Sequence, residues 1–110
     1  MPHLVIAYSQ DLEQDYSIET LMNQTYKAAI ESDLFSPERI KVRAKAYEYS
    51  LVGGENKPFA HTTVYLLSGR DKEKKAKLAS LVRDSQLKCL KQVDNITVDV
   101  RDLDRDVYQK

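Results

Sequence analysis

Apolar and polar residues follow two periods along this chain, one typical of strands and one of helices. Residues 3–9 form a β-prone run that is largely apolar on both alternating faces, which suits a central strand. Residues 40–49 predict a strand, and over residues 40–46 apolar and basic side chains alternate, which gives one apolar and one cationic face. From Tyr47 the phase changes, which indicates a bulge or an extension that pairs with another chain.

Two longer segments repeat their apolar residues at helical spacing. The first follows Ser17, a favourable N-cap residue, and is expected to end near residues 31–33. The second opens at residues 68–71, which resemble a capping box. Its expected buried stripe comprises Leu78, Leu81, Val82, Ser85, Cys89 and Val93. Leu87 lies opposite this stripe and is a candidate for contact with another subunit.

Two further strands are predicted over residues 59–67 and 96–101, and residues 10–16 read as a polar connector. The order of elements is therefore β-α-β, repeated once. It predicts an α+β fold in one domain, residues 1–110, with a four-stranded sheet and two helices on one face. The other face would be open in a monomer, so we expect oligomerisation through the sheet.

Composition narrows the class of protein. Of the 110 residues, 42% are hydrophobic and 31% are charged, as in ordinary soluble domains. No apolar run is long enough to span a membrane, and no secretory signal is visible. The single cysteine, Cys89, cannot form an internal disulfide, and a pI near 6.7 lacks the basic character of nucleic-acid binders. We expect a cytoplasmic protein with no membrane or nucleic-acid partner.

The net charge of zero conceals an uneven distribution. Residues 1–33 carry a net charge of −5, and residues 70–91 carry +5. Most of the lysines in the second segment are typical of a solvated helix face. Lys41, Arg43 and Arg70 lie elsewhere and are the candidates for binding an anion.

Most motifs of catalysis are missing. The chain has no phosphate-loop motif, no GxGxxG, no HExxH and no CxxC, and we expect no metal site. The start of the chain is unusual, because Met1 and Pro2 directly precede a strand. Removal of Met1 would leave a secondary amine held by the sheet. An α-amine has a reference pKa of about 8, and burial beside Lys or Arg would lower it, giving a competent general base. The alternative is that Pro2 is an incidental second residue.

Residues 1–6, 40–43, 59–64 and 68–70 are similar to the corresponding stretches of one enzyme family. They resemble the 5-carboxymethyl-2-hydroxymuconate isomerases of the tautomerase superfamily. The resemblance implies a homotrimer of two-βαβ subunits with Pro2 as the acid–base catalyst. It also implies a cofactor-free shift of a double bond in a 2-hydroxymuconate-type polycarboxylate, as in homoprotocatechuate breakdown.

Cations are expected to hold the carboxylates of such a substrate and the oxygen of its dienolate intermediate. We assign this role to Lys41, Arg43 and Arg70, with Arg70 expected at a helix N-terminus. His3 and His61 match family positions and are expected to pack or hydrogen-bond behind these groups.

Two alternatives are left open. The family pattern has Arg at the position of Lys41, and Lys offers a point charge in place of a planar fork. A tautomerase acting on a different enol or keto acid is therefore one alternative. The other is a non-catalytic ferredoxin-like module that associates with itself through its sheet.

Overall fold

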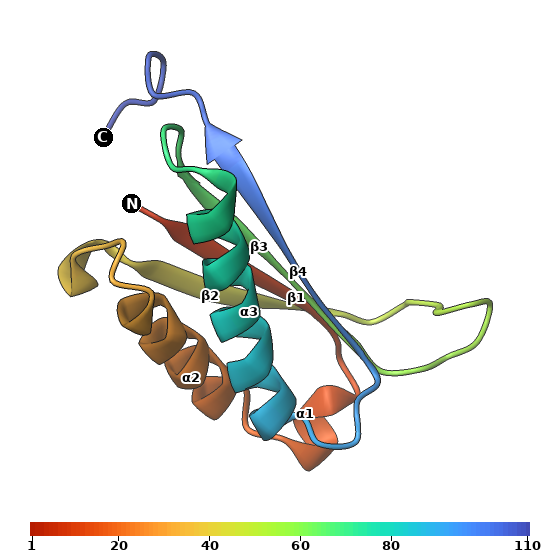
Figure 1. Ribbon diagram of the computed structural model, residues 1–110. Coiled ribbons are helices and arrows are strands. Elements are labelled where there is room, and N and C mark those ends of the chain that lie inside the picture. Colours follow the sequence, from red (N-terminus) through yellow and green to blue (C-terminus); the bar gives the residue numbers. More distant parts are fainter.

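The computed structural model describes residues 1–110 and contains one mixed sheet with helices on one face (Figure 1). The elements follow in the order β1 His3–Ser9, α1 Leu12–Asp15, α2 Ile18–Glu31, a 3-10 turn Pro37–Arg39, β2 Lys41–Tyr47, β3 Phe59–Leu67, α3 Lys72–Cys89 and β4 Asn95–Leu103. None of the helices combines the length and the apolar character that crossing a membrane requires.

The four strands are ordered β2-β1-β3-β4. β1 pairs in parallel with β2 and antiparallel with β3, and β3 pairs in parallel with β4. A helix joins each parallel pair, because the chain must return to the starting end of the sheet before it can form a parallel partner. These helices, α2 and α3, lie side by side on the same face (Figure 1). The expected α+β fold of two β-α-β units is confirmed.

The side chains that point from the sheet toward α2 and α3 form the core. Leu4 and Ile6 of β1 and Val64 of β3 are fully buried. They pack in two clusters that include Leu21 of α2 and Leu78 of α3. Alternation along each strand therefore directs one set of apolar residues to the helices.

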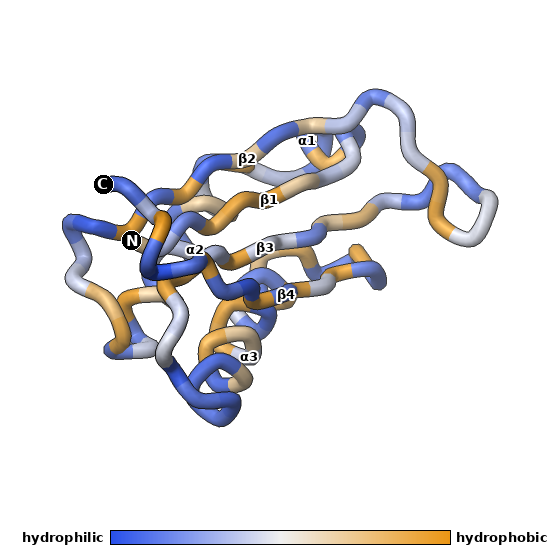
Figure 2. Tube along the Cα trace, turned by 90° about the horizontal axis from the view of Figure 1, so that it is seen from above, coloured by the Kyte–Doolittle hydropathy of each residue, from blue (hydrophilic) through white to orange (hydrophobic).

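The opposite face of the sheet is uncovered. Lys41, Arg43 and Lys45 project from β2 on this side and are exposed, and the alternation of polar and apolar residues along β2 is visible in Figure 2. His3 lies beside Lys41 in register, and Val5 lies beside Arg43. This open face thus presents a cationic edge strand next to an inner strand of mixed polarity.

The strand expected over residues 40–49 ends at Tyr47. Residues 48–58, the β2–β3 arm, leave the sheet and extend away from the rest of the molecule (Figure 1). Tyr49 and Leu51 of this arm are 89% and 71% exposed. The phase change at Tyr47 marks the end of a strand rather than a bulge within one, and pairing of the arm with another chain stays a prediction.

Two expectations about helices are wrong. The segment expected to be a polar connector contains the short helix α1, because Leu12 turns inward and is buried. The expected capping box does not form, because Asp71 is itself the N-cap of α3 and accepts a 2.9 Å hydrogen bond from the amide of Lys74. Gly69 has a φ of 122°, so the chain turns sharply here and leaves Ser68 outside the helix.

The buried stripe of α3 also differs from the expected one. Gln86 is fully buried, whereas Ser85 and Cys89 are partly exposed. The Gln86 amide nitrogen donates to the hydroxyls of Thr25 on α2 and Thr62 on β3, at 3.0 and 2.8 Å. A polar side chain is tolerated in the core because these hydroxyls partner its amide nitrogen, although its amide oxygen has no partner.

Candidate functional site

Pro2 is buried immediately before the inner strand β1. Its carbonyl accepts a 3.0 Å hydrogen bond from the backbone amide of Lys41, the first residue of β2. The amine of Met1 donates to the carbonyl of Arg39 at 3.1 Å. Most chain ends are loosely held, but this one is tied to β2 and to the turn before it.

The charges around the terminal amine are positive. Burial lowers the pKa of the Met1 amine below its usual value of 8.0, and the charges of Lys41, Arg39, Lys110 and Arg70 lower it further. A lowered pKa increases the fraction of neutral amine near pH 7, and the neutral form is the one that accepts a proton. The end of the sheet at which β1 begins therefore favours an amine that acts as a base, and its positive charges attract an anion.

A pocket of about 230 Å³ adjoins the amine and is lined by Met1, Lys41, Tyr108, Gln109 and Lys110. The pocket forms because β4 runs parallel to β3, so that β4 ends at the same end of the sheet at which β1 begins. The residues after β4 thus return to the start of the chain, and both chain ends lie on the same side of the molecule in Figure 1.

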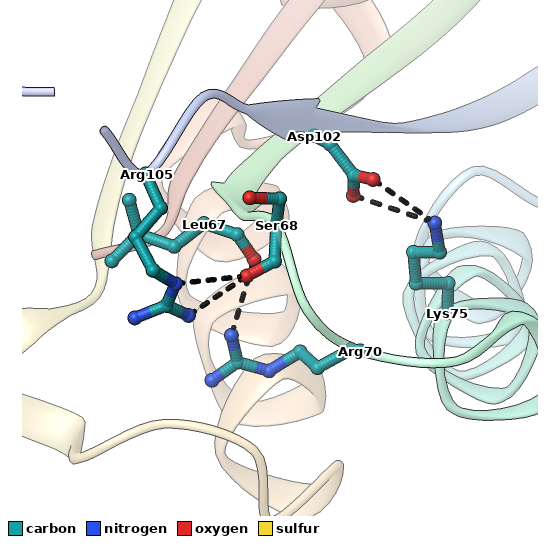
Figure 3. Close-up of polar contacts among 6 residues, drawn as sticks. All are labelled: Leu67, Ser68, Arg70, Lys75, Asp102 and Arg105. Carbon is teal, nitrogen blue, oxygen red and sulfur yellow. Dashed lines mark hydrogen bonds and ion pairs between the residues drawn. The ribbon is translucent and has the colours of Figure 1, made fainter. Parts of the chain in front are cut away.

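Arg70 lies one residue before Asp71, the N-cap of α3, and so flanks the N-terminus of this helix. Its guanidinium donates to the carbonyls of Leu34 and Leu67, at 3.0 and 3.4 Å, and lies 5.2 Å from the ring centroid of Phe35. Figure 3 shows this side chain at the turn between β3 and α3. Arg70 joins this turn to the segment before β2, and it is not among the residues that line the pocket beside the amine.

Arg43 and His3 are joined on the open face of the sheet. Nη1 of Arg43 lies 3.1 Å from Nδ1 of His3, and Nε2 of His3 lies 3.1 Å from the hydroxyl of Tyr108. Burial lowers the pKa of His3, and the charges of Arg43 and Lys41 lower it further. The neutral form of His3 is therefore favoured, and the imidazole hydrogen-bonds between β2 and the tail.

His61 lies further along the sheet. It is paired with Ala7, whereas His3 is paired with Tyr65, so the two histidines are separated by roughly 13 Å along the strands. Nδ1 of His61 lies 2.6 Å from the hydroxyl of Thr97 on β4. The structure brings Pro2, His3 and Lys41 to the same end of the sheet but leaves His61 apart from them.

The largest cavity, of about 400 Å³, lies at the other end of β1 and β2. Its lining includes Asp11, Glu13 and Glu48. The hydroxyl of Tyr8 donates to Glu13 at 2.6 Å, and burial together with this bond raises the pKa of Tyr8 to about 12. An acidic lining repels a polycarboxylate, so the smaller cationic pocket is the better candidate for such a ligand.

Three residues near the amine were not expected there: Arg39, Tyr108 and Lys110. Tyr108 is one of few apolar side chains in a polar tail. This position is the only feature of the sequence that could have indicated a role for Tyr108 in the site. Arg39 and Lys110 leave no such sign, because their approach to the amine depends on which strands pair.

The strand order and the arrangement of the two β-α-β units define a tautomerase-fold protein. The chain belongs to the 5-carboxymethyl-2-hydroxymuconate isomerase family, whose family model matches residues 2–99. It is therefore an isomerase of the tautomerase superfamily, and the resemblance noted in the sequence is confirmed. No curated protein matches the sequence.

Solved structures share the fold at low sequence identity. A 5-carboxymethyl-2-hydroxymuconate delta-isomerase is 19% identical, with a TM-score of 0.81 over 100% of this chain and 87% of that one. Pt0534 inactivated by 2-oxo-3-pentynoate is 15% identical, with a TM-score of 0.87 over 98% and 90% of the two chains. A fused 4-OT symmetric trimer is 18% identical, with a TM-score of 0.79 over 94% and 86%.

Proposed function

We propose that the protein is a cofactor-free isomerase that moves a double bond in a 2-hydroxymuconate-type polycarboxylate, with the amine of Pro2 as general acid and base after removal of Met1. The observation that supports this proposal is that the Lys41 amide of β2 holds the Pro2 carbonyl, while Arg39, Lys41, Arg70 and Lys110 act on the terminal amine one residue earlier. We place the reaction in the cytoplasm, because Cys89 is a free thiol.

The proposed reaction conserves all atoms of the substrate. The neutral Pro2 amine takes the proton of the enol hydroxyl, and the oxygen electron pair forms a carbonyl. The electrons of the conjugated system move along the chain, so one double bond shifts. The far carbon then takes the proton from the ammonium, which restores the neutral amine. Cations near the site stabilise the dienolate between these two transfers.

Each proposed anion-binding residue has a different relation to the amine. Lys41 lines the pocket and is the largest of the charge effects that lower the pKa of the terminal amine. Arg70 is held by two carbonyls and acts on the same amine. Arg43 is exposed on the open face, two residues along β2 from Lys41. We propose that Lys41 and Arg70 bind the carboxylates of the substrate, and that Arg43 orients His3 through its hydrogen bond to Nδ1.

The first experiment compares the chain with and without its proline amine. Intact mass is expected to show loss of Met1, and Pro2→Ala is expected to lower kcat/KM for a 2-hydroxymuconate-type dienol by about 100-fold or more. Pro58→Ala, in the β2–β3 arm, is the matched control and is expected to retain the wild-type rate. Retained Met1 in a fully active enzyme, or undiminished turnover by Pro2→Ala, would contradict the proposal.

A covalent probe gives an independent test. Pt0534 is inactivated by 2-oxo-3-pentynoate, and this ynone is an electrophile to which a neutral amine adds. We expect one equivalent to attach to the wild-type protein and peptide mapping to place it on Pro2. Attachment to Cys89 or to a lysine alone would count against Pro2 as the reactive amine.

A second candidate function keeps the amine and changes the substrate. Lys41 supplies a single charge, and the pocket of about 230 Å³ is small, which favours a smaller enol or keto acid. A panel of muconates and phenylpyruvate-type enols distinguishes the two. A kcat/KM preference for the monoacids would favour this second function.

We also propose that the working enzyme is a homotrimer that forms through the open face of the sheet. Tyr49 and Leu51 on the β2–β3 arm are largely exposed in the single chain, and exposed apolar residues of this kind mark interaction sites. The fold-related fused 4-OT structure is a trimer, which supports this proposal by analogy.

A further inference from the structure

Tyr108 reaches the amine pocket because the tail after β4 turns back on itself. The carbonyl of Asp104 accepts hydrogen bonds from the amides of Val107 and Tyr108, at 3.2 and 3.1 Å. The Asp104 carboxylate accepts another from the amide of Asp106 at 3.0 Å. These three bonds close a turn, so the backbone itself sets the position of Tyr108.

Arg105 fixes this turn to the connection between β3 and α3. Its Nε and Nη2 donate to the carbonyl of Ser68, at 3.1 and 2.8 Å (Figure 3). The same connection holds Arg70, whose charge acts on the terminal amine. The tail and Arg70 are therefore both attached to the connection between β3 and α3. This attachment fixes the position of Tyr108 beside the pocket.

The hydrogen bonds of His3 determine what the Tyr108 hydroxyl can do. A guanidinium only donates, so Nδ1 of His3 accepts from Arg43 and Nε2 of the neutral ring carries the hydrogen. The oxygen of Tyr108 then accepts from Nε2 at 3.1 Å. The hydroxyl hydrogen of Tyr108 is left over, and no hydrogen bond within the chain uses it.

That hydrogen is available beside a pocket with positive charge. Tyr108 lines the pocket together with Lys41 and Lys110. An ammonium attracts a carboxylate but sets little direction, because its three donors rotate freely. The hydroxyl of Tyr108 has a direction, since its oxygen is held by His3 and its ring lies edge-on to that imidazole with centroids 6.4 Å apart.

We propose that Tyr108 is a substrate-binding residue, whose hydroxyl donates a hydrogen bond to a carboxylate of the substrate held by Lys41. The identity of the substrate as a polycarboxylate rests on the proposed isomerase function. The hydroxyl orients a group that Lys41 alone would only attract, and Arg43 and His3 set its direction from the open face of the sheet.

The test separates binding from turnover. Adipate, a saturated dicarboxylate that cannot isomerise, is titrated into the wild-type protein, Tyr108→Phe and Tyr16→Phe, and the affinities are measured by calorimetry. Tyr108→Phe keeps the ring and removes the hydroxyl, so we expect affinity to fall about tenfold, the usual loss for one hydrogen bond to a charged group. Tyr16→Phe removes a hydroxyl bonded to the amide of Gln92, away from the pocket, and is expected to bind adipate as the wild type does.

Kinetics give the second measurement. With a 2-hydroxymuconate-type dienol, Tyr108→Phe is expected to raise KM about tenfold and to change kcat by less than about twofold, because the hydroxyl binds a group that does not react. Unchanged KM and unchanged adipate affinity in Tyr108→Phe would overturn the inference. So would a wild-type protein that does not bind adipate, or an equal loss of affinity in Tyr16→Phe.

The outcomes also distinguish this inference from the proposed function. If Tyr108→Phe weakens adipate binding while Pro2→Ala retains full turnover, the carboxylate site stands and the role of Pro2 fails. If Pro2→Ala abolishes turnover while Tyr108→Phe matches the wild type in both measurements, the isomerase stands and the role of Tyr108 fails.

Discussion

The guanidinium of Arg43 lies 3.1 Å from Nδ1 of His3, which joins the edge strand β2 to the first residue of the inner strand β1. This contact has a consequence for protonation. A proton on Nδ1 would face a cation and lose its acceptor role, so the contact favours the neutral imidazole. It also fixes the tautomer that faces Tyr108.

We predict that Arg43→Gln raises the pKa of His3 toward its usual value of 6.5, because burial, Arg43 and Lys41 together lower it in the native chain. The imidazole signal followed by NMR against pH measures the change. Lys45→Gln removes a charge from the same face of β2 and serves as the control, with an unchanged pKa. An equal shift in both variants would show that Arg43 has no specific effect.

The lowered pKa of His3 also affects stability. The unfolded chain binds a proton more readily than the folded one, so the native state loses stability as the pH falls below about 6.5 toward the lowered native pKa. Arg43→Gln is expected to reduce this acid-dependent loss, as measured by urea unfolding between pH 7 and pH 5.

Lys41→Gln is expected to raise the pKa of the terminal amine, whichever residue bears it. Removal of a neighbouring positive charge stabilises the ammonium form. A smaller fraction of neutral amine is then present at pH 7, and the acid limb of the kcat/KM profile moves to higher pH. Lys57→Gln, whose ammonium pairs with Glu55 on the β2–β3 arm, is expected to leave that limb in place. A profile unchanged by Lys41→Gln would contradict the prediction.

Asp71→Ala is expected to lower the free energy of unfolding by about 1 kcal/mol, because it removes the hydrogen bond to the amide of Lys74 that caps α3. Ser68→Ala is the matched control and is expected to change stability by less than about 0.5 kcal/mol. Urea denaturation of the two variants measures both values. A larger loss of stability in Ser68→Ala than in Asp71→Ala would contradict this prediction and support the capping box that the sequence suggests.

Gln86→Ala is expected to lower the free energy of unfolding by about 2–4 kcal/mol, since it leaves a cavity and removes hydrogen bonds to Thr25 and Thr62. Gln86→Met fills the space and removes an amide oxygen that has no partner, so its loss is expected to be smaller. Gln92→Ala, on the surface, is the control and is expected to stay within about 0.5 kcal/mol of the wild type. Equal losses for the Ala and Met variants would show that packing contributes nothing.

The trimer proposal predicts different effects for two exposed leucines. Leu51 on the β2–β3 arm is 71% exposed and Leu87 on α3 is 36% exposed. Leu51→Glu is expected to shift the assembly toward monomers in sedimentation velocity, because it places a charge in the proposed interface. Leu87→Glu is expected to leave a trimer formed through the sheet intact, whereas dissociation by this variant alone would support the subunit contact that the sequence suggests for Leu87 on the helix layer.

Much of the fold follows from local patterns. The strand over residues 59–67 and the strand over residues 3–9 have the bounds expected from apolar spacing. Ser17 caps α2 as expected, accepting a 3.2 Å hydrogen bond from the amide of Thr20. These features are decided by residues within one or two turns, so they can be read along the chain. The start of α3 cannot be predicted in this way, because Ser68 and Asp71 are both good caps and the turn at Gly69 selects between them.

Some residues of the candidate site can likewise be predicted from the sequence, and others cannot. Pro2, Lys41, Arg43 and Arg70 stand out in the sequence through their residue types and their place beside strands. Tyr108 does not, because it meets His3 from 105 positions away. That meeting requires the antiparallel pairing of β1 with β3 and the parallel pairing of β3 with β4, which bring the end of β4 to the start of β1.

The sequence by itself determined the strands, the main helices, their order and the family of this protein, because apolar periodicity and short motifs are local properties of the chain. Only the tertiary structure decided which groups surround the terminal amine, which carbonyls hold Arg70, and which tyrosine lines the pocket. Those relations depend on strand order and on the return of the tail, and they join residues that no local interaction connects.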